Sequence, residues 1–166
     1  MLELLGGDPE YYEPSILPLP ESLRLQTEQG FKEVDGCVVP RSFEPFAIWT
    51  KDRPHVVNQD DETGLECLIN KVHLDGLVPS ETGISELARL GLDYAFHLKR
   101  ALQKERPAGE FAIIVSAREP DQELNIGATC CVRFHRIRAG QVWLDKNLEH
   151  YKEEAIALCE FNPSTS

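Results

Sequence analysis

The sequence predicts a single α+β domain in which a mixed or mostly antiparallel sheet packs against one long helix, with a shorter helix near the C-terminus. Three observations predict this class. The chain has 166 residues and is 42% hydrophobic, enough for one sizeable core. Residues 82–106 carry an apolar stripe at helical spacing, and residues 111–118 are apolar almost throughout, as in a buried strand.

Residues 1–30 predict an irregular, acidic arm that lies on the domain. Four prolines interrupt this segment, and proline removes backbone donors that helices and strands need: Pro9, Pro14, Pro18 and Pro20. We therefore expect one domain over residues 1–166, with its compact core in residues 31–160.

The next part of the chain predicts mainly strands. Residues 31–34 and 37–39 form a hairpin pattern, because Asp35-Gly36 suits a two-residue turn between apolar residues. A second strand is expected over residues 43–50, interrupted by Pro45. Residues 58–64 read as a loop, and residues 65–74 as a strand that ends at Asp75-Gly76.

Residues 82–106 are the strongest helix prediction. Thr82 is a suitable N-terminal cap, and basic residues gather at the C-terminal end, where they suit the helix dipole. Pro107 and Gly109 end the pattern. The apolar stripe consists of Ile84, Leu87, Leu90, Tyr94, Leu98 and Ala101.

The C-terminal part predicts two long strands and a helix. The strands cover residues 111–118 and 128–138, with an acidic loop over residues 119–125 between them. A turn at Ala139-Gly140 leads to a short return strand over residues 141–144. A helix is then expected from Asp145 or Asn147 to about Leu158.

The charge balance favours some partners over others. Seventeen Lys and Arg oppose twenty-eight Asp and Glu, giving a net charge of -11. This field repels nucleic acids and anionic membranes, and it favours a basic protein partner. No stretch is apolar enough to span a membrane, and the N-terminus lacks the pattern of a secretory signal, so we expect a cytoplasmic protein. The five cysteines are then expected to be reduced and mostly buried.

Two acidic loops are the predicted partner-binding sites. One holds Asp60, Asp61 and Glu62, and the other holds Glu119, Asp121 and Glu123. Loops tolerate such charge, and acidic side chains at an interface attract a basic partner. The simpler interpretation is that these residues are solvated and contribute only to solubility.

A basic cluster offers an alternative anion site. It comprises Arg133, His135, Arg136 and Arg138, whose guanidinium groups suit carboxylates or phosphates. Pairing with Glu119, Asp121 or Glu123 would instead make the cluster purely structural. Cys131 and His135 share a strand face but lie about 13 Å apart along it, too far for a thiol–imidazole pair. No catalytic signature, metal motif or cofactor motif occurs.

The block of residues 131–155 carries a family resemblance. It begins Cys131-Val-Arg-Phe-His-Arg-Ile-Arg and continues through Trp143-Leu-Asp into an acidic segment. This pattern resembles the C-terminal part of small immunity-type proteins of bacterial polymorphic toxin systems. The resemblance implies a non-catalytic inhibitor of one cognate toxin. The alternatives are a small enzyme that acts on an anionic substrate through Arg133, His135 and Arg136, and a homo-oligomeric structural protein.

Overall fold

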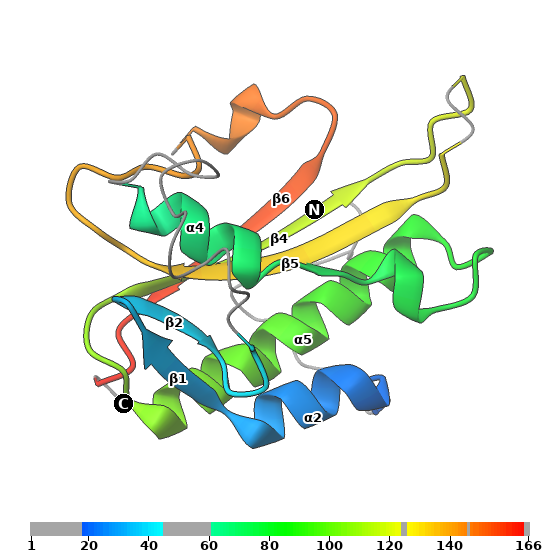
Figure 1. The fold of residues 1–166 in the computed structure, drawn as a ribbon. Helices are drawn as coiled ribbons and strands as arrows, with labels where there is room; N and C mark the ends of the chain where they lie inside the picture. Colours follow the sequence, from blue (N-terminus) through cyan, green and yellow to red (C-terminus); the bar gives the residue numbers. More distant parts are fainter. Residues whose placement is uncertain (1–17, 45–60, 124–125, 146, 165–166) are drawn as a thin grey trace.

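The computed structural model describes residues 18–44, 61–123, 126–145 and 147–164 and has a mixed α+β architecture (Figure 1). Its main sheet is antiparallel with the strand order β3-β5-β4-β6, and a separate hairpin pairs β1 with β2. The elements are α2 (Glu21–Gln29), β1 (Phe31–Val34), β2 (Cys37–Pro40), α4 (Glu62–Ile69), β3 (Val72–His73), η3 (Asp75–Leu77), α5 (Ile84–Glu105), β4 (Phe111–Arg118), β5 (Thr129–Arg136), η4 (Leu148–His150) and β6 (Ala155–Phe161).

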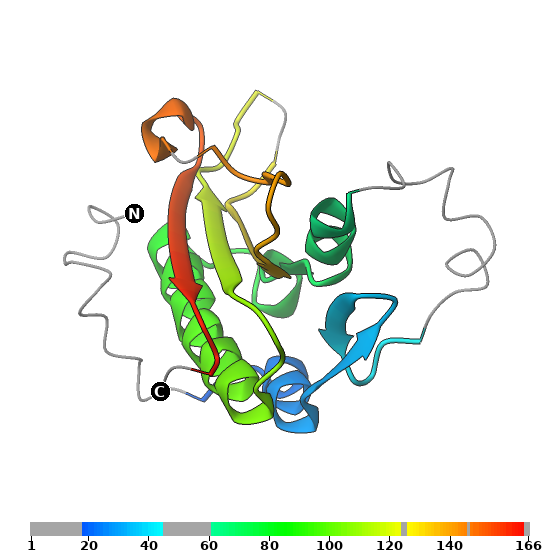
Figure 2. The ribbon, with the colours of Figure 1, turned by 90° about the vertical axis from the view of Figure 1, so that its left-hand side faces the viewer.

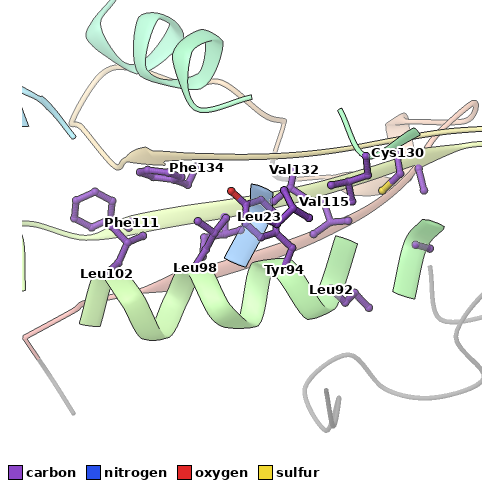
Figure 3. Packing of buried hydrophobic residues seen from close by; sticks show 14 of the residues in the cluster. Leu23, Leu92, Tyr94, Leu98, Leu102, Phe111, Val115, Cys130, Val132 and Phe134 are labelled. Carbon is purple, nitrogen blue, oxygen red and sulfur yellow. The ribbon is translucent and has the colours of Figure 1, made fainter. Parts of the chain in front are cut away.

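The long helix α5 forms the core with one face of the main sheet. Leu98 and Leu102 of α5 are fully buried and pack toward Phe111, Val132 and Phe134 of β4 and β5 (Figure 3). The predicted helix and the predicted strand over residues 111–118 are confirmed. The helix begins at Ile84, and Glu86 accepts a hydrogen bond from the Gly83 N–H, so Thr82 is not its cap.

The strand register divides the main sheet into two faces. Ile113 of β4 lies opposite Phe134 of β5 and Cys159 of β6, and these residues face α5. Their neighbours alternate to the other face, which we call the outer face. The sheet lies between α5 on one side and α4 on the other (Figure 2).

The hairpin of β1 and β2 is confirmed. Val34 pairs with Cys37 across the two-residue turn, in which Asp35 and Gly36 have φ values of 48° and 80°. Both turn residues thus have the positive φ that this tight hairpin requires, and glycine adopts it without strain. The hairpin is a separate sheet, and its strand β2 faces α4 and β5.

The loop predicted over residues 58–64 is wrong from residue 62, the strand predicted over residues 65–74 is wrong for most of its length, and residues 58–60 lie outside the described residues. Residues 62–69 form α4 instead of a loop and a strand, and only Val72–His73 pair as β3. The apolar residues Leu65, Leu68 and Ile69 have the spacing of a helix face, and the side chain of Asp61 accepts a hydrogen bond from the Gly64 N–H at the helix start. A short apolar run does not distinguish these two structures.

The N-terminal prediction is corrected within the described residues. Residues 21–29 form α2, which packs Leu23 into the core, so this part is not an irregular arm. Pro18 and Pro20 precede the helix, where a missing N–H leaves no helical hydrogen bond unmade. Residues 1–17 and most of the strand predicted over residues 43–50 lie outside the described residues, and residues 43–44 form no strand.

The C-terminal helix and the return strand over residues 141–144 are also wrong. A single turn of 3-10 helix, Leu148–His150, is followed by β6, which pairs along β4. Alanine-rich composition favours helix locally, but Ala157 and Cys159 alternate with Leu158, as a strand pattern does. Pairing along the free edge of β4 decides between these two tendencies.

Candidate functional site

The predicted basic cluster divides between two environments in the structure. Arg136 and Arg138 lie where β5 meets the hairpin, and both donate to the carbonyl oxygen of Gly36, at 3.2 and 2.9 Å. Arg136 also pairs with Glu33 at 2.9 Å, while Arg138 pairs with Glu62 at 3.2 Å and with Glu66 at 2.8 Å. These two guanidinium groups therefore hold the hairpin and α4 against the end of β5.

Glu66 and Asn70 of α4 complete this connection. The carboxylate of Glu66 accepts hydrogen bonds from the backbone N–H groups of Val38 and Arg136, at 2.5 and 2.6 Å. The side-chain amide of Asn70 donates to the carbonyl oxygens of Val38 and Phe134, at 2.8 and 3.2 Å. Both side chains are buried and span the space between the edges of β2 and β5. We call Glu66, Asn70, Arg136 and Arg138 the polar clamp.

The polar clamp has different acidic partners from those considered in the sequence. Arg136 and Arg138 lie at the far end of β5 from the acidic loop that holds Glu119, because β5 runs away from that loop. Eight strand residues separate the two ends by about 24 Å. The internal partners are instead Glu33, Glu62 and Glu66, and these contacts occupy donors that an anion site would need.

Arg133 and His135 point to the outer face of the sheet. His135 is buried, its Nδ1 donates to the carbonyl oxygen of Arg136 at 2.9 Å, and burial lowers the pKa of the imidazole. Arg133 donates to the sulfur of Cys131 at 2.9 Å, and its guanidinium lies 5.6 Å from the centre of the Trp143 ring. The Nε of Arg133 is buried and has no hydrogen-bond partner.

Two of the buried cysteines, Cys67 and Cys130, are unsuited to an activated thiol site. All five carry free thiols, and all except Cys159 are buried, as predicted. Burial raises the pKa of Cys67 far above its usual range and that of Cys130 to about 12. A thiol with a raised pKa is a poor nucleophile at neutral pH. Among the described residues, no group of three His, Cys, Asp or Glu side chains is placed to hold a metal ion.

The first predicted acidic loop has structural roles. Asp60 lies outside the described residues. Asp61 caps α4 through the Gly64 N–H at 2.7 Å, and Glu62 pairs with Arg138. Charge reversal at Asp61 or Glu62 would therefore disturb the fold as well as any contact with a partner.

The second acidic loop is largely exposed and has acidic neighbours. It joins β4 to β5, and Asp121 turns inward, where it accepts from the Glu123 N–H and pairs with Arg118 at 3.8 Å. Arg118 also pairs with Glu153 at 3.2 Å, which brings the segment before β6 beside this loop. We call this surface the acidic end. It comprises Glu119, Asp121, Glu123, Glu153 and Glu154.

An exposed apolar pair lies on the outer face, beside the start of α4 and over the middle of β5. The exposed fractions are 78% for Val142 and 39% for Trp143. Gln141 connects their segment to α4, because its side-chain oxygen accepts a hydrogen bond from the Thr63 N–H at 2.9 Å. The guanidinium of Arg133 lies against the face of the Trp143 ring. Arg133 is four residues from the start of β5 at the acidic end, about 14 Å along the strand. The apolar pair and the acidic end therefore fit within one protein interface.

Sequence reasoning missed three residues that define these surfaces. The sequence predicts a strand at Glu66, a helix at Glu153 and a return strand at Trp143, and none of these predictions assigns the residue a role at a surface or a contact. A signal for Glu66 was available, because an acid flanked by Leu65 and Cys67 in an apolar run requires a partner when it is buried.

No helix in the described part of the chain is long and apolar enough to cross a membrane. Comparison with curated proteins and with solved structures gives no significant match. The sequence model of one protein family matches residues 10–166. The chain therefore belongs to the Uncharacterized protein PM0498 family.

Proposed function

We propose that this chain is a cytoplasmic, non-catalytic protein-binding module, an immunity protein that inhibits a cognate toxin. The observation that carries the proposal is the exposed Val142–Trp143 pair, which lies about 14 Å along β5 from the acidic end. Interface hot spots are enriched in tryptophan, and a surrounding rim of charge gives specificity and speeds association. The resemblance of residues 131–155 to immunity-type proteins supports the toxin as the kind of partner.

The charge of the acidic end supports a basic partner. Glu119, Glu123 and Glu154 are exposed, Arg118 is balanced by Asp121 and Glu153, and Lys152 is the neighbouring exposed basic residue. The net charge of -11 has the same sign. A basic toxin surface would be attracted over a distance of about 10 Å at ordinary salt concentrations.

The enzymatic alternative has less support. It requires Arg133, His135 and Arg136 to act together on an anion, but Arg136 faces the α5 side of the sheet and donates to Glu33 and Gly36. His135 is buried and donates to a backbone carbonyl. Only Arg133 retains a buried nitrogen without a partner on the outer face.

The test is co-expression with the products of neighbouring genes. We expect the wild-type chain to restore growth to cells that express its toxin and to form a complex with it. The variant Glu119→Lys/Glu123→Lys/Glu154→Lys changes exposed acids of the acidic end. It should associate at least about tenfold more slowly and with a weaker dependence on salt.

A matched control separates local charge from total charge. The variant Glu21→Lys/Glu44→Lys/Glu110→Lys makes the same change in net charge at exposed positions outside the acidic end. It should associate nearly as fast as the wild type. Equal association rates for the two triple variants would contradict the proposed contact surface, and the absence of any protective complex would contradict the function itself.

A further inference from the structure

The two edge strands of the main sheet differ in how far their backbone groups are covered. The outer edge of β5 is covered by β3 at Cys131 and Val132, and by the side chains of Glu66 and Asn70 near its end. At the opposite edge, β6 pairs with β4 on one side, and no described strand pairs with its other side. Within the described part of the chain, the backbone N–H and C=O groups on this side of β6 are thus open to a further strand.

Glu160 is the one charged residue of β6 that protects this edge. Natural sheets block exposed edges with proline, lysine, bulges or very short strands. β6 is seven residues long and has the sequence Ala-Ile-Ala-Leu-Cys-Glu-Phe, which contains neither proline nor lysine. Its regular pairing with β4 from Ala155 to Phe161 shows no bulge. Such an edge suits addition of a strand from another chain.

The outer face connects β6 with the proposed partner-binding surface. Arg133, Ile114 and Leu158 form one cross-strand row, and Trp143 lies over Arg133 at the start of that row. Leu158, at the other end of the row, is 37% exposed. A strand added beside β6 would extend this row and place its own side chains next to Leu158.

The charges near β6 determine which kind of additional strand could pair with it. Residues 149–164 hold four acidic residues and a single lysine, and the acidic end adjoins the start of β6 through the ion pair between Arg118 and Glu153. Glu160 lies within the strand and is exposed. These charges disfavour a second copy of this acidic chain and favour a basic segment.

We propose that β6 binds an extended, basic segment of the partner protein as an additional strand of the main sheet. This inference rests on the proposed function and specifies how the partner is recognised. Backbone hydrogen bonds to β6 would supply affinity, while contacts with Leu158 and the surrounding acids would supply specificity.

The test uses a pair of peptides with equal charge. The probe is the octapeptide acetyl-(Lys-Val)4-amide, and the control replaces the two central valines by proline, which cannot donate to a ladder. Binding is measured by titration calorimetry, and exchange of the β6 amides by NMR. We expect the probe to bind at least about tenfold more tightly and to slow exchange of the outward-pointing amides of β6.

Two variants of the protein sharpen this test. Leu158→Lys places a positive charge at the centre of β6, and Leu68→Lys places the same charge on α4 at a side chain that is 57% exposed. Leu158→Lys should weaken binding of the probe by about tenfold, because residue 158 lies on the edge strand. Leu68→Lys should weaken it by less than about twofold, because residue 68 lies on α4. Thermal unfolding checks that both variants remain folded.

Three outcomes would overturn the inference. Equal binding of the two peptides would mean attraction by charge alone, and it would leave the proposed function standing. Absence of binding by the probe, while the cognate toxin still binds, would exclude strand addition without affecting the function. Protection of β6 that depends on protein concentration without peptide would show that a second copy occupies the edge.

Discussion

Replacement of Glu66 by glutamine tests the polar clamp most directly. Glu66 is fully buried, with an exposed fraction of 0%, and its two oxygens accept three hydrogen bonds. Oε2 accepts from Arg136 and Arg138, and Oε1 accepts from Val38. Glutamine can keep its oxygen toward the two arginines only by turning its NH2 group toward the Val38 N–H, which also donates.

The magnitude follows from the groups left without partners. A buried donor without an acceptor costs about 1–3 kcal/mol, and the loss of negative charge next to Arg138 adds to this. Arg138 keeps Glu62 and the Gly36 carbonyl, so the ion-pair loss is partial. We expect Glu66→Gln to lower the free energy of unfolding by about 2–4 kcal/mol, and Glu66→Ala by about 3–5 kcal/mol.

Urea unfolding followed by circular dichroism measures this difference, and Glu62→Gln is the matched control. Glu62 contacts the same arginine, but its side chain is 41% exposed, so its loss should cost less than about 1 kcal/mol. Exchange of the Val38 amide should also accelerate in Glu66→Gln. If Glu66→Gln is no less stable than Glu62→Gln, the polar clamp does not hold the hairpin as described.

The remaining predictions concern the core, the buried histidine and the thiols. Leu98→Ala should lower the free energy of unfolding by about 2–5 kcal/mol, whereas Leu68→Ala at an exposed position should cost less than about 1 kcal/mol; similar melting temperatures would refute the core assignment. Because burial lowers the pKa of His135, the unfolded chain takes up its proton first as the pH falls below about 6.5. Stability should therefore decline as the pH falls from 7 through the folded pKa, and His135→Gln should remove that part of the slope; an unchanged slope would exclude His135 as its source. Iodoacetamide should modify Cys159 first in the native protein and the four buried thiols only after denaturation, as peptide mass mapping would reveal.

Elements with strong local signals could be predicted from the sequence. The helix over Ile84–Glu105 has six turns of consistent apolar spacing, and the strand Phe111–Arg118 is apolar except at Ser116 and Arg118. Asp35-Gly36 predicted the hairpin because few other dipeptides adopt two positive φ values easily. Each of these signals lies within the segment it describes, so no knowledge of neighbours is needed.

The segments that failed depend on their neighbours. Residues 62–69 are too short for periodicity to separate helix from strand, and the structure is decided by the cap at Asp61 and by packing on the outer face. Ala155–Phe161 has helical propensity at its alanines, but the vacant edge of β4 accepts it as a strand. A single sequence does not show that this edge is vacant.

The candidate site was predictable only in part, for the same reason. The acidic loop with Glu119 and Glu123 was identified by its charge, and the structure leaves both side chains exposed. The contact between Arg133 and Trp143 joins β5 to a segment ten residues later, and the pairing of Arg118 with Glu153 spans thirty-five positions. Such contacts follow from the strand order, which the wrong assignment of residues 145–158 concealed.

The acidity of this chain has two physical roles, and only one of them concerns a partner. Glu33, Glu62 and the buried Glu66 are paired with Arg136 and Arg138, so they add little to the field that an approaching protein meets. The exposed acids at the acidic end have less compensation, which comes from Arg118 and the neighbouring Lys152. The salt dependence of association should therefore depend on where an acid lies, and total net charge alone should predict it poorly. The two sheet edges differ in the same way: the buried carboxylate of Glu66 helps to cover the edge of β5, whereas the exposed Glu160 and the acidic end lie at β6.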